Sequence, residues 1–167
     1  VAVPEANVRA VPDGLPLDVA ALCEPAAVAV HALRRSPVPP AGQTVAVFGA
    51  GPIGILVGQW ARIMGAGQVL LFDPVAYRLE MAQACGLANV FDPSQTPPRQ
   101  VIRDLTHGHG ASICVDAAGV PATVVEACES VARGGTVVLL GNPAADVTLP
   151  KATVSRVLRM EATIVGV

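Results

Sequence analysis

The sequence predicts an α/β domain built on a doubly wound, parallel sheet of six strands in the order 3-2-1-4-5-6. Three observations support this prediction. After Gly42, short apolar strands alternate with helix-like segments, which is typical of a parallel sheet covered on both faces. The composition is 52% apolar and only 3% aromatic, which suits close packing of helices on a buried sheet. A glycine-rich turn joins the first of these strands to the helix that follows it.

The expected elements follow one another in a regular order. Strands are expected at residues 44–48, 68–73, 89–91, 111–116, 136–140 and 163–167. Helices are expected between them at residues 52–64, 75–85, 98–106 and 121–132, with a short one at 152–159. Each strand-helix-strand crossover should be right-handed, and this handedness leads to the doubly wound strand order.

The first 36 residues are expected to lie outside this domain, which would occupy residues 37–167. Residues 1–18 contain two Pro-bounded pieces, V-A-V-P and V-R-A-V-P-D-G, that look like the end of a strand from another domain. From Pro25 to about Arg35 the apolar positions fit a helix, because a proline is well tolerated in a first turn. The segment S-P-V-P-P-A-G then ends that helix.

Charge and hydropathy argue against several kinds of partner. The net charge is −2 and no Lys/Arg cluster occurs, so a nucleic-acid partner is not expected. The 26 residues between Arg35 and Arg62 carry no charge, but prolines and glycines divide them, so they should form buried core rather than a membrane span. The start of the chain does not look like a secretion signal, and the four cysteines form no C-x-x-C pair. We therefore expect a cytoplasmic protein with reduced thiols and no membrane partner.

The turn G-A-G-P-I-G, from Gly49 to Gly54, follows the strand T-V-A-V-F directly. A lone G-x-G-x-x-G is weak evidence, but here it stands between an expected strand and an expected helix. Gly49 would permit the tight turn, Gly51 would leave room for a pyrophosphate, and Gly54 would let the helix pack closely on the strand. The helix N-terminus would then present free N–H groups to the phosphates.

Asp73 stands nineteen residues after Gly54, at the end of the second expected strand. This spacing is close to the ~20 residues expected for the acid that hydrogen-bonds an adenosine ribose. Such a carboxylate would repel a 2′-phosphate, and Pro74 replaces the Arg or Ser that often accommodates NADP, so NAD is favoured. Taken alone, Asp73 fits the N-cap of the next helix equally well; together with the glycines, ribose binding is favoured. A methyltransferase that binds S-adenosylmethionine is the main alternative on this fold, but it would lack the three-glycine turn and would normally end with an antiparallel strand.

Longer segments of the chain resemble one family. These segments are C-E-P-A-A-V-A-V-H-A-L-R-R (residues 23–35), V-A-V-F-G-A-G-P-I-G, F-D-P-V-A-Y-R-L, D-A-A-G-V-P, A-R-G-G-T-V-V-L-L-G and L-R-M-E-A-T-I-V-G-V. Together they resemble the zinc-containing medium-chain dehydrogenases, with sorbitol and galactitol-phosphate dehydrogenases the most similar. The resemblance covers essentially the whole chain. It implies that residues 1–36 are the tail of a GroES-like catalytic domain with a connecting helix, and that residues 37–167 are an NAD-binding Rossmann domain.

The resemblance also implies roles for single residues. The cofactor-binding set is Gly49, Gly51, Pro52, Ile53, Gly54, Asp73, Arg78, Ala117, Ala118, Leu140, Gly141, Asn142 and Val167. Pro52 and Ile53 would contact the pyrophosphate and nicotinamide side, and Arg78 would flank the adenine ribose. Ala117 and Ala118 would lie near the adenosine and its ribose, and the last four residues of the set would line the nicotinamide carboxamide. The alternatives are a solvated helix face for Arg78 and plain turns for the glycines.

Glu24 is the one residue to which the resemblance gives direct chemistry, as a ligand or near-ligand of a catalytic zinc. Zinc at that position acts as a Lewis acid that lowers the pKa of the bound alcohol. Alternatively, Glu24 only favours the positive end of the helix beside it. His31 is expected to be a packed or hydrogen-bonded interface residue, and His107 with His109 would make an incomplete metal site. The family's other zinc ligands, a Cys and a Gly-His-Glu run, would lie upstream of residue 1.

The expected function is therefore that of the NAD-binding domain of a zinc-dependent alcohol or polyol dehydrogenase. The intact enzyme would transfer hydride between NAD and a secondary alcohol, such as a sugar alcohol or its phosphate, and this part alone is expected to be inactive. Its expected partners are the alcohol, the missing catalytic domain and a second copy, paired through the apolar last strand A-T-I-V-G-V. The alternatives are a non-catalytic NAD-sensing module and a zinc-free quinone reductase of the same superfamily. Asp73 and the E-P-x-x-x-x-x-H-A segment disfavour the reductase.

Overall fold

A computed structural model describes residues 2–167, and its centre is a six-stranded sheet in the order β3-β2-β1-β4-β5-β6. The strands are β1 (Thr44–Phe48), β2 (Gln68–Phe72), β3 (Val90–Phe91), β4 (Ala111–Asp116), β5 (Val131–Leu139) and β6 (Thr163–Gly166). Every neighbouring pair is parallel. The predicted fold class and strand order are thus confirmed, and the antiparallel last strand of the methyltransferase alternative does not occur in this sheet.

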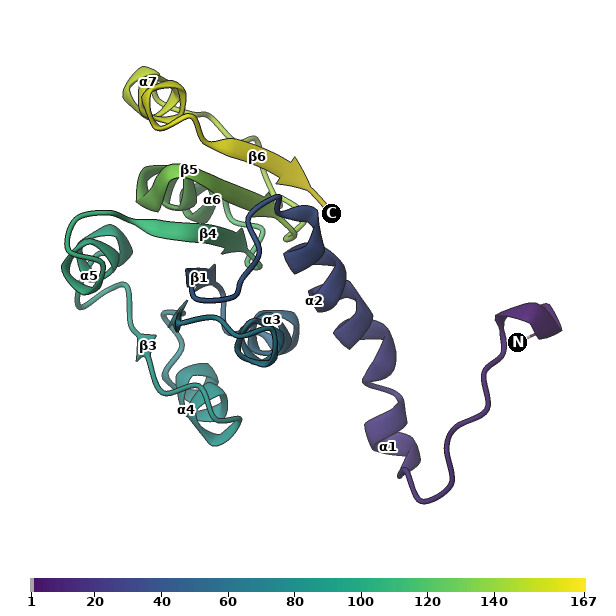
Figure 1. Ribbon diagram of the computed structural model, residues 1–167. Helices are drawn as coiled ribbons and strands as arrows, with labels where there is room; N and C mark the ends of the chain where they lie inside the picture. The colour runs from purple at the N-terminus through teal and green to yellow at the C-terminus, as the bar shows by residue number, and fades with distance from the viewer. Residues whose placement is uncertain (1) are drawn as a thin grey trace.

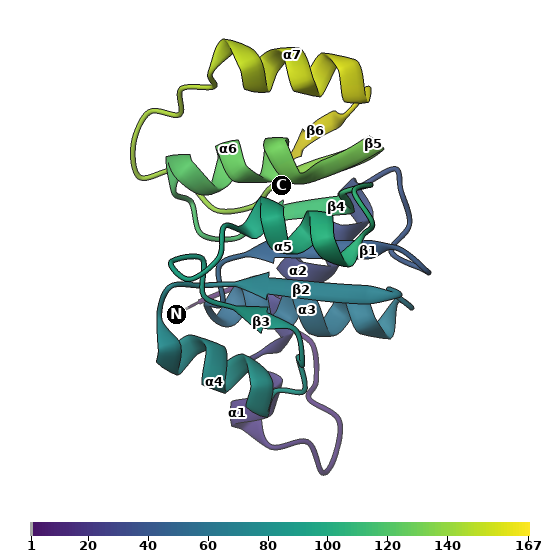
Figure 2. The same cartoon turned by 90° about the vertical axis from the view of Figure 1, so that its left-hand side faces the viewer.

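Helices cover both faces of the sheet (Figures 1 and 2). One layer contains α2 (Cys23–Arg35), α3 (Pro52–Ile63) and α4 (Ala76–Ala84); the other contains α5 (Pro98–Leu105), α6 (Pro121–Ser130) and α7 (Lys151–Met160). Each layer shares its own buried apolar cluster with the sheet. Because every strand runs the same way, the turns that leave the carboxyl ends of the strands all lie along one edge.

Strand β1 shows how the sequence supports both layers. Successive side chains of a strand point to opposite faces of the sheet. Val45 and Val47 pack in the cluster that contains α2 and α3 side chains, whereas Ala46 and Phe48 pack in the cluster that contains α5 and α6 side chains. Both faces are covered, so the strand is an unbroken apolar run rather than an alternation of apolar and polar residues.

Residues 2–22 lie apart from the sheet and are mostly exposed (Figure 1). They contain the short 3-10 helix Glu5–Asn7 and α1 (Leu17–Ala20), and no strand is formed within them. No segment of residues 2–167 pairs with these residues, and an unpaired strand is not stable in water, so their place at the end of a strand from another domain stays a prediction. Helix α2 begins at Cys23, slightly before the expected start at Pro25.

The junction between α6 and β5 also differs from the prediction. The helix ends at Ser130 and the strand begins at Val131, whereas the sequence predicted a helix to residue 132 and a strand from residue 136. The pairing explains the difference. Ala111 lies opposite Val131 and Ile113 lies opposite Thr136, so the extra residues of β5 form a bulge between these two pairs.

No helix within residues 2–167 combines the length and the apolar character needed to cross a bilayer. The uncharged stretch between Arg35 and Arg62 instead forms a loop, β1, the glycine turn and α3. Residues 45–48 of β1 lie buried between the two helix layers. This stretch is core, as predicted.

Candidate functional site

The turn between β1 and α3 contains two glycines at which an added side chain would strain the backbone or clash with it. Gly49 has a φ of +109°, and a Cβ atom there would lie 3.1 Å from the backbone carbonyl carbon of Ala117. A Cβ atom on Gly54 would lie only 1.9 Å from the carbonyl oxygen of Gly49. Gly54 therefore lets the first turn of α3 approach the end of β1, and Gly49 lets the turn approach the segment that follows β4.

Gly51 occupies a different environment from these two glycines. A Cβ atom added there would meet no other atom within 4 Å, so this side of the turn faces open space. Gly51 is also the N-cap of α3, and Pro52 is the first residue of the helix. The first N–H groups of a helix have no carbonyl partner one turn back, and they carry a partial positive charge. The open space in front of Gly51 is thus suited to an anionic group.

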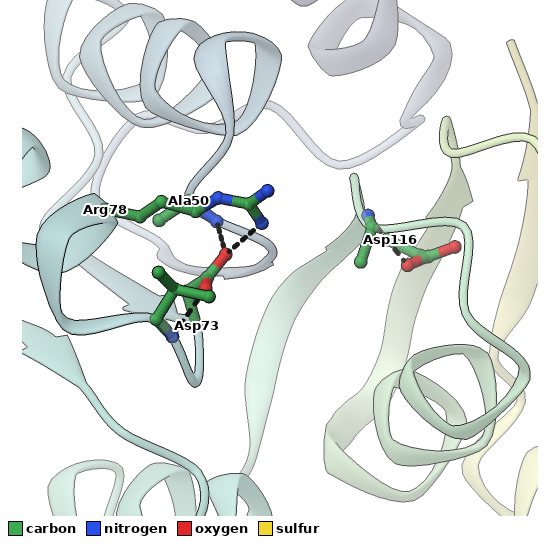
Figure 3. Close-up of polar contacts among 6 residues, drawn as sticks. Ala50, Asp73, Arg78 and Asp116 are labelled. Atoms are coloured by element: carbon green, nitrogen blue, oxygen red, sulfur yellow. Dashed lines mark hydrogen bonds and ion pairs between the residues drawn. The ribbon is translucent and has the colours of Figure 1, made fainter.

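Asp73 follows β2 and reaches the glycine turn (Figure 3). Its Oδ2 accepts a hydrogen bond of 2.8 Å from the backbone N–H of Ala50, and its Oδ1 accepts one of 2.9 Å from the N–H of Val75. The residue is only 2% exposed. The acid predicted from its spacing therefore lies against the turn, and the same carboxylate also satisfies the N–H at the start of α4.

Arg78 forms an ion pair with Asp73, with 3.2 Å between Nη1 and Oδ2 (Figure 3). Its side chain is 53% exposed, so water screens much of this interaction. Arg78 thus lies beside the acid, while about half of its side chain remains in solvent; its predicted place beside the adenine ribose stays a prediction.

Asp116, at the end of β4, holds the turn between β4 and α6 by hydrogen bonds. Its Oδ1 accepts hydrogen bonds from the N–H groups of Ala118 at 3.2 Å and Gly119 at 3.3 Å, and from the hydroxyl of Thr123 at 2.7 Å. The residue is fully buried, and its Oδ2 has no hydrogen-bond partner within residues 2–167. Sequence reasoning did not single out Asp116. The available signal was an acid at the carboxyl end of an otherwise apolar strand.

A cleft of about 570 Å³ lies at this edge of the sheet. Six of the predicted cofactor-binding residues line it: Gly49, Gly51, Asp73, Arg78, Ala117 and Ala118. Apolar residues form much of the rest of its wall, among them Phe48, Phe72, Pro93, Pro98 and Val120. A mostly apolar cleft with a few fixed polar groups is typical of a small-molecule site.

Glu126 and Thr123 add polar groups to this cleft that sequence reasoning missed. Oε1 of Glu126 accepts a hydrogen bond of 2.8 Å from the backbone N–H of Arg99, which joins α6 to the start of α5. Both lining residues come from α6, far along the chain from the glycine turn. No local motif marks them, so only their position near the carboxyl edge would have drawn attention to α6.

The remaining predicted residues lie along the same edge but do not line this cleft. They are Pro52, Ile53, Gly54, Leu140, Gly141, Asn142 and Val167. Leu140 and Gly141 donate their N–H groups to the carbonyl oxygen of Asp116, at 3.0 and 2.8 Å. Val167 donates its N–H to the carbonyl oxygen of Leu139 at 3.2 Å. Asn142 and Val167 are exposed. The structure thus divides the predicted set into residues that line the cleft, residues at the start of α3, and residues that follow the ends of β5 and β6.

Glu24 lies in the first turn of α2, where it is exposed. Residues 2–167 contain no group of three or more His, Cys, Asp or Glu side chains that could hold a metal ion. His31, His107 and His109 are all exposed as well. A zinc site needs three or four protein ligands, so the residues described here do not fit zinc by themselves.

Comparison with known families gives a match to the zinc-binding dehydrogenases over residues 52–167. Sorbitol dehydrogenase of Bacillus subtilis is 34% identical over 133 residues, which are 80% of this chain and 37% of that protein. L-threonine 3-dehydrogenase of Caldanaerobacter subterraneus is 33% identical over 141 residues, which are 84% of this chain and 40% of that protein. The chain therefore spans about two fifths of the length of these relatives.

Solved structures show the same similarity. Galactitol-1-phosphate dehydrogenase from Escherichia coli superposes with a TM-score of 0.88 at 31% identity, over 98% of this chain and 47% of that chain. A zinc-binding dehydrogenase from Sinorhizobium meliloti, solved with bound NADP, superposes with a TM-score of 0.76 at 31% identity, over 87% of this chain and 43% of that chain.

Proposed function

This chain belongs to the zinc-binding dehydrogenase family, and we propose that it is the NAD-binding part of a zinc-dependent alcohol or polyol dehydrogenase. Residues 37–167 form the Rossmann domain in this proposal, and residues 1–36 form the end of a catalytic domain and the helix that connects to it. One observation carries the proposal. The buried carboxylate of Asp73 is hydrogen-bonded to the glycine turn, and both line a mostly apolar cleft.

The pyrophosphate of the dinucleotide is proposed to lie at the N-terminus of α3, against Gly51. Two features support this position: the open space beside Gly51 and the unpaired N–H groups of the first helical turn. The steric roles of Gly49 and Gly54 support it further, because they bring strand and helix close enough to present those groups together. Pro52 and Ile53, at the start of the helix, would lie beside the phosphates.

Asp73 is proposed to bind the hydroxyl groups of the adenosine ribose, with Arg78 beside it. A buried carboxylate in the wall of the cleft would repel a 2′-phosphate, and this favours NAD over NADP. The adenine would then occupy the apolar part of the cleft, between Ala117 and Ala118 and the wall that contains Pro93. This wall is mostly apolar, which suits a heterocyclic ring.

The nicotinamide half is proposed to lie along Leu140, Gly141, Asn142 and Val167. These residues follow the carboxyl ends of β5 and β6, where ligands of doubly wound sheets bind. In the intact enzyme, hydride would pass between this ring and a secondary alcohol, such as a sugar alcohol or its phosphate.

Zinc is proposed to belong to the intact enzyme, with Glu24 at or near its site. When bound, the metal would supply a Lewis acid that favours ionisation of the alcohol. The residues described here do not form its ligand set, so we propose that this chain alone binds NAD without turning over substrate.

A second copy of the chain is proposed to pair along β6. This strand lies at the edge of the sheet, and Ile164 and Val167 are 40% and 45% exposed there. An apolar edge strand is a template for pairing with another strand. We also propose a cytoplasmic location, in keeping with four cysteines that are all free.

The test is titration of the 167-residue chain with NAD by isothermal calorimetry. Gly51→Asp places a carboxylate in the open space proposed for the phosphates and should abolish binding. Gly51→Asn is the matched control, because it has the same size without the charge, and it should retain measurable binding. Both variants should fold, since nothing lies within 4 Å of an added Cβ atom. Absence of NAD binding by the unmodified chain, or equal affinities of the two variants, would refute the proposal.

A further inference from the structure

A second hollow, of about 480 Å³, lies between α5, α6 and α7. These three helices cover the same face of the sheet and are seen together in Figure 2. The hollow shares no lining residue with the cleft that contains Asp73. It is therefore a separate site on the molecule, and none of the cofactor-binding residues predicted from the sequence contributes to it.

The lining of this hollow is rich in positive charge. Arg99 and Arg103 come from α5, Arg156 comes from α7, and the single acidic residue is Glu129. Glu129 is already occupied, because Arg99 approaches its Oε2 at 2.6 Å and the Thr153 hydroxyl donates to its Oε1 at 2.8 Å. Within residues 2–167, neither Arg103 nor Arg156 has an acidic partner. Two guanidinium groups thus share one hollow without a counter-charge.

Two enclosed polar atoms of the lining residues also lack partners within the described chain. Arg156 donates one hydrogen bond, from Nη2 to the carbonyl oxygen of Val131 at 3.2 Å, but its Nε is enclosed and unpaired. Ser130 is 3% exposed, and its hydroxyl is also enclosed without a partner. Polar groups shut away from water are normally hydrogen-bonded. Ser130 and Arg156 both line the hollow, so a small rotation of either side chain would bring its unpaired donor to an anionic acceptor held there by the two arginines that lack an acidic partner.

We propose that this hollow binds the phosphate group of a small molecule. Guanidinium groups match the geometry of phosphate oxygens through paired N–H donors, and a serine hydroxyl adds a further donor. A nucleic-acid strand is not expected as the occupant, because the chain has a net charge of −2 and the unpaired arginines are confined to one hollow. The binding does not depend on the proposed NAD site.

The test uses pyrophosphate as the probe, titrated into the full chain by isothermal calorimetry. The Gly51→Asp background should remove binding at the glycine turn, so that the remaining heat can be assigned to the second hollow with the variants below. Saturable binding is expected, and it should weaken as NaCl is raised, because it depends on charge. Inorganic phosphate should bind at the same place more weakly, since it carries fewer acceptor oxygens.

Arg103→Gln is the decisive variant, because Arg103 is exposed and its replacement should not disturb folding. We expect its dissociation constant for pyrophosphate to rise by about tenfold, the loss typical of one charge-assisted contact. Arg133→Gln is the matched control, because this arginine is also exposed and pairs with Glu161 away from the hollow. The affinity of this variant for pyrophosphate should stay within about twofold of that of the background chain. Arg156→Lys keeps the charge but loses the planar donor pair and should weaken binding as well. No saturable binding, or an equal loss in Arg103→Gln and Arg133→Gln, would overturn the proposal.

Discussion

The carboxyl edge of the sheet has two regions that differ in how completely this chain builds them. Around β1, β2 and β4 the edge has a cleft, a buried acid and a turn in which two glycines are sterically required. Along β5 and β6 the edge ends in exposed residues such as Asn142 and Val167, outside that cleft. The first region takes all its walls from one sheet and its crossover helices. The second presents backbone and side chains that require a further surface to enclose a ligand.

The two regions also differ in their buried acids, Asp73 and Asp116, which both lie in the first region. Asp73 holds the glycine turn and Asp116 holds the following turn, each by hydrogen bonds to backbone N–H groups. A hydrogen bond between a charged group and the backbone contributes more than a neutral one, about 1.5–3 kcal/mol. These hydrogen bonds hold the two turns of the β1, β2 and β4 region in place without a ligand. The β5 and β6 end has no such acid among the residues predicted to bind the cofactor.

The largest effect that bears on this comparison is expected from Gly54→Ala. The new Cβ atom would lie 1.9 Å from the carbonyl oxygen of Gly49, so the helix must move away from the strand. We expect the free energy of unfolding, measured in urea, to fall by about 3 kcal/mol. Gly51→Ala has open space around the added carbon, so it should change the free energy of unfolding by less than about 1 kcal/mol. Equal stability of the two variants would show that the turn is not preorganised.

A smaller effect is expected from Asp73→Asn on the binding of AMP, which carries only the adenosine half of the cofactor. The amide keeps the size of the side chain but loses the charge, and the dissociation constant should rise by about tenfold. Asn142→Ala, at the second region, should leave AMP affinity within about twofold. Isothermal calorimetry with both variants tests the division of the edge directly.

Titration of the unmodified chain with both NAD and AMP measures how much the β5 and β6 region adds to cofactor binding. Because the β5 and β6 region is exposed here, NAD should bind this chain no more than about tenfold more tightly than AMP. A much larger preference for NAD would mean that the nicotinamide side is already complete in this chain.

The smallest effect is expected from Arg78→Gln. The side chain is 53% exposed, and exposed ion pairs contribute little, so the free energy of unfolding should change by less than about 1 kcal/mol. AMP affinity should fall by no more than about threefold. A loss as large as that of Asp73→Asn would instead assign Arg78 an equal share in binding the ribose.

Periodicity and glycine spacing were sufficient to predict the fold. Strand order follows from alternating strands and helices with right-handed crossovers, and the sheet confirms it. The spacing from Gly54 also led to Asp73, because the length of a helix and strand fixes where the second strand ends. These signals are local in sequence, so they can be read without knowledge of the packing.

Contacts between distant segments could not be predicted in the same way. Glu126 lines the cleft because α6 packs beside the start of α5, which no local pattern records. β5 begins at Val131 because this residue pairs with Ala111. The sequence did not indicate this start, because the apolar pattern of the preceding helix continues into residues 131 and 132. In residues 2–22, strand-like residues did not form a strand, because strand formation needs a neighbour.

The bulge in β5 has a consequence for changes in chain length. Residues 132–135 lie between the pairs that join Val131 to Ala111 and Thr136 to Ile113, at the end of the sheet opposite the cleft. Gly134 has open space around it, and Arg133 is exposed. An insertion beside Gly134 should therefore be tolerated, because strand pairing restarts at Thr136 and the cleft lies at the opposite edge of the sheet. Gly135 should not be displaced, because a Cβ atom there would lie 2.8 Å from the carbonyl oxygen of Ser112.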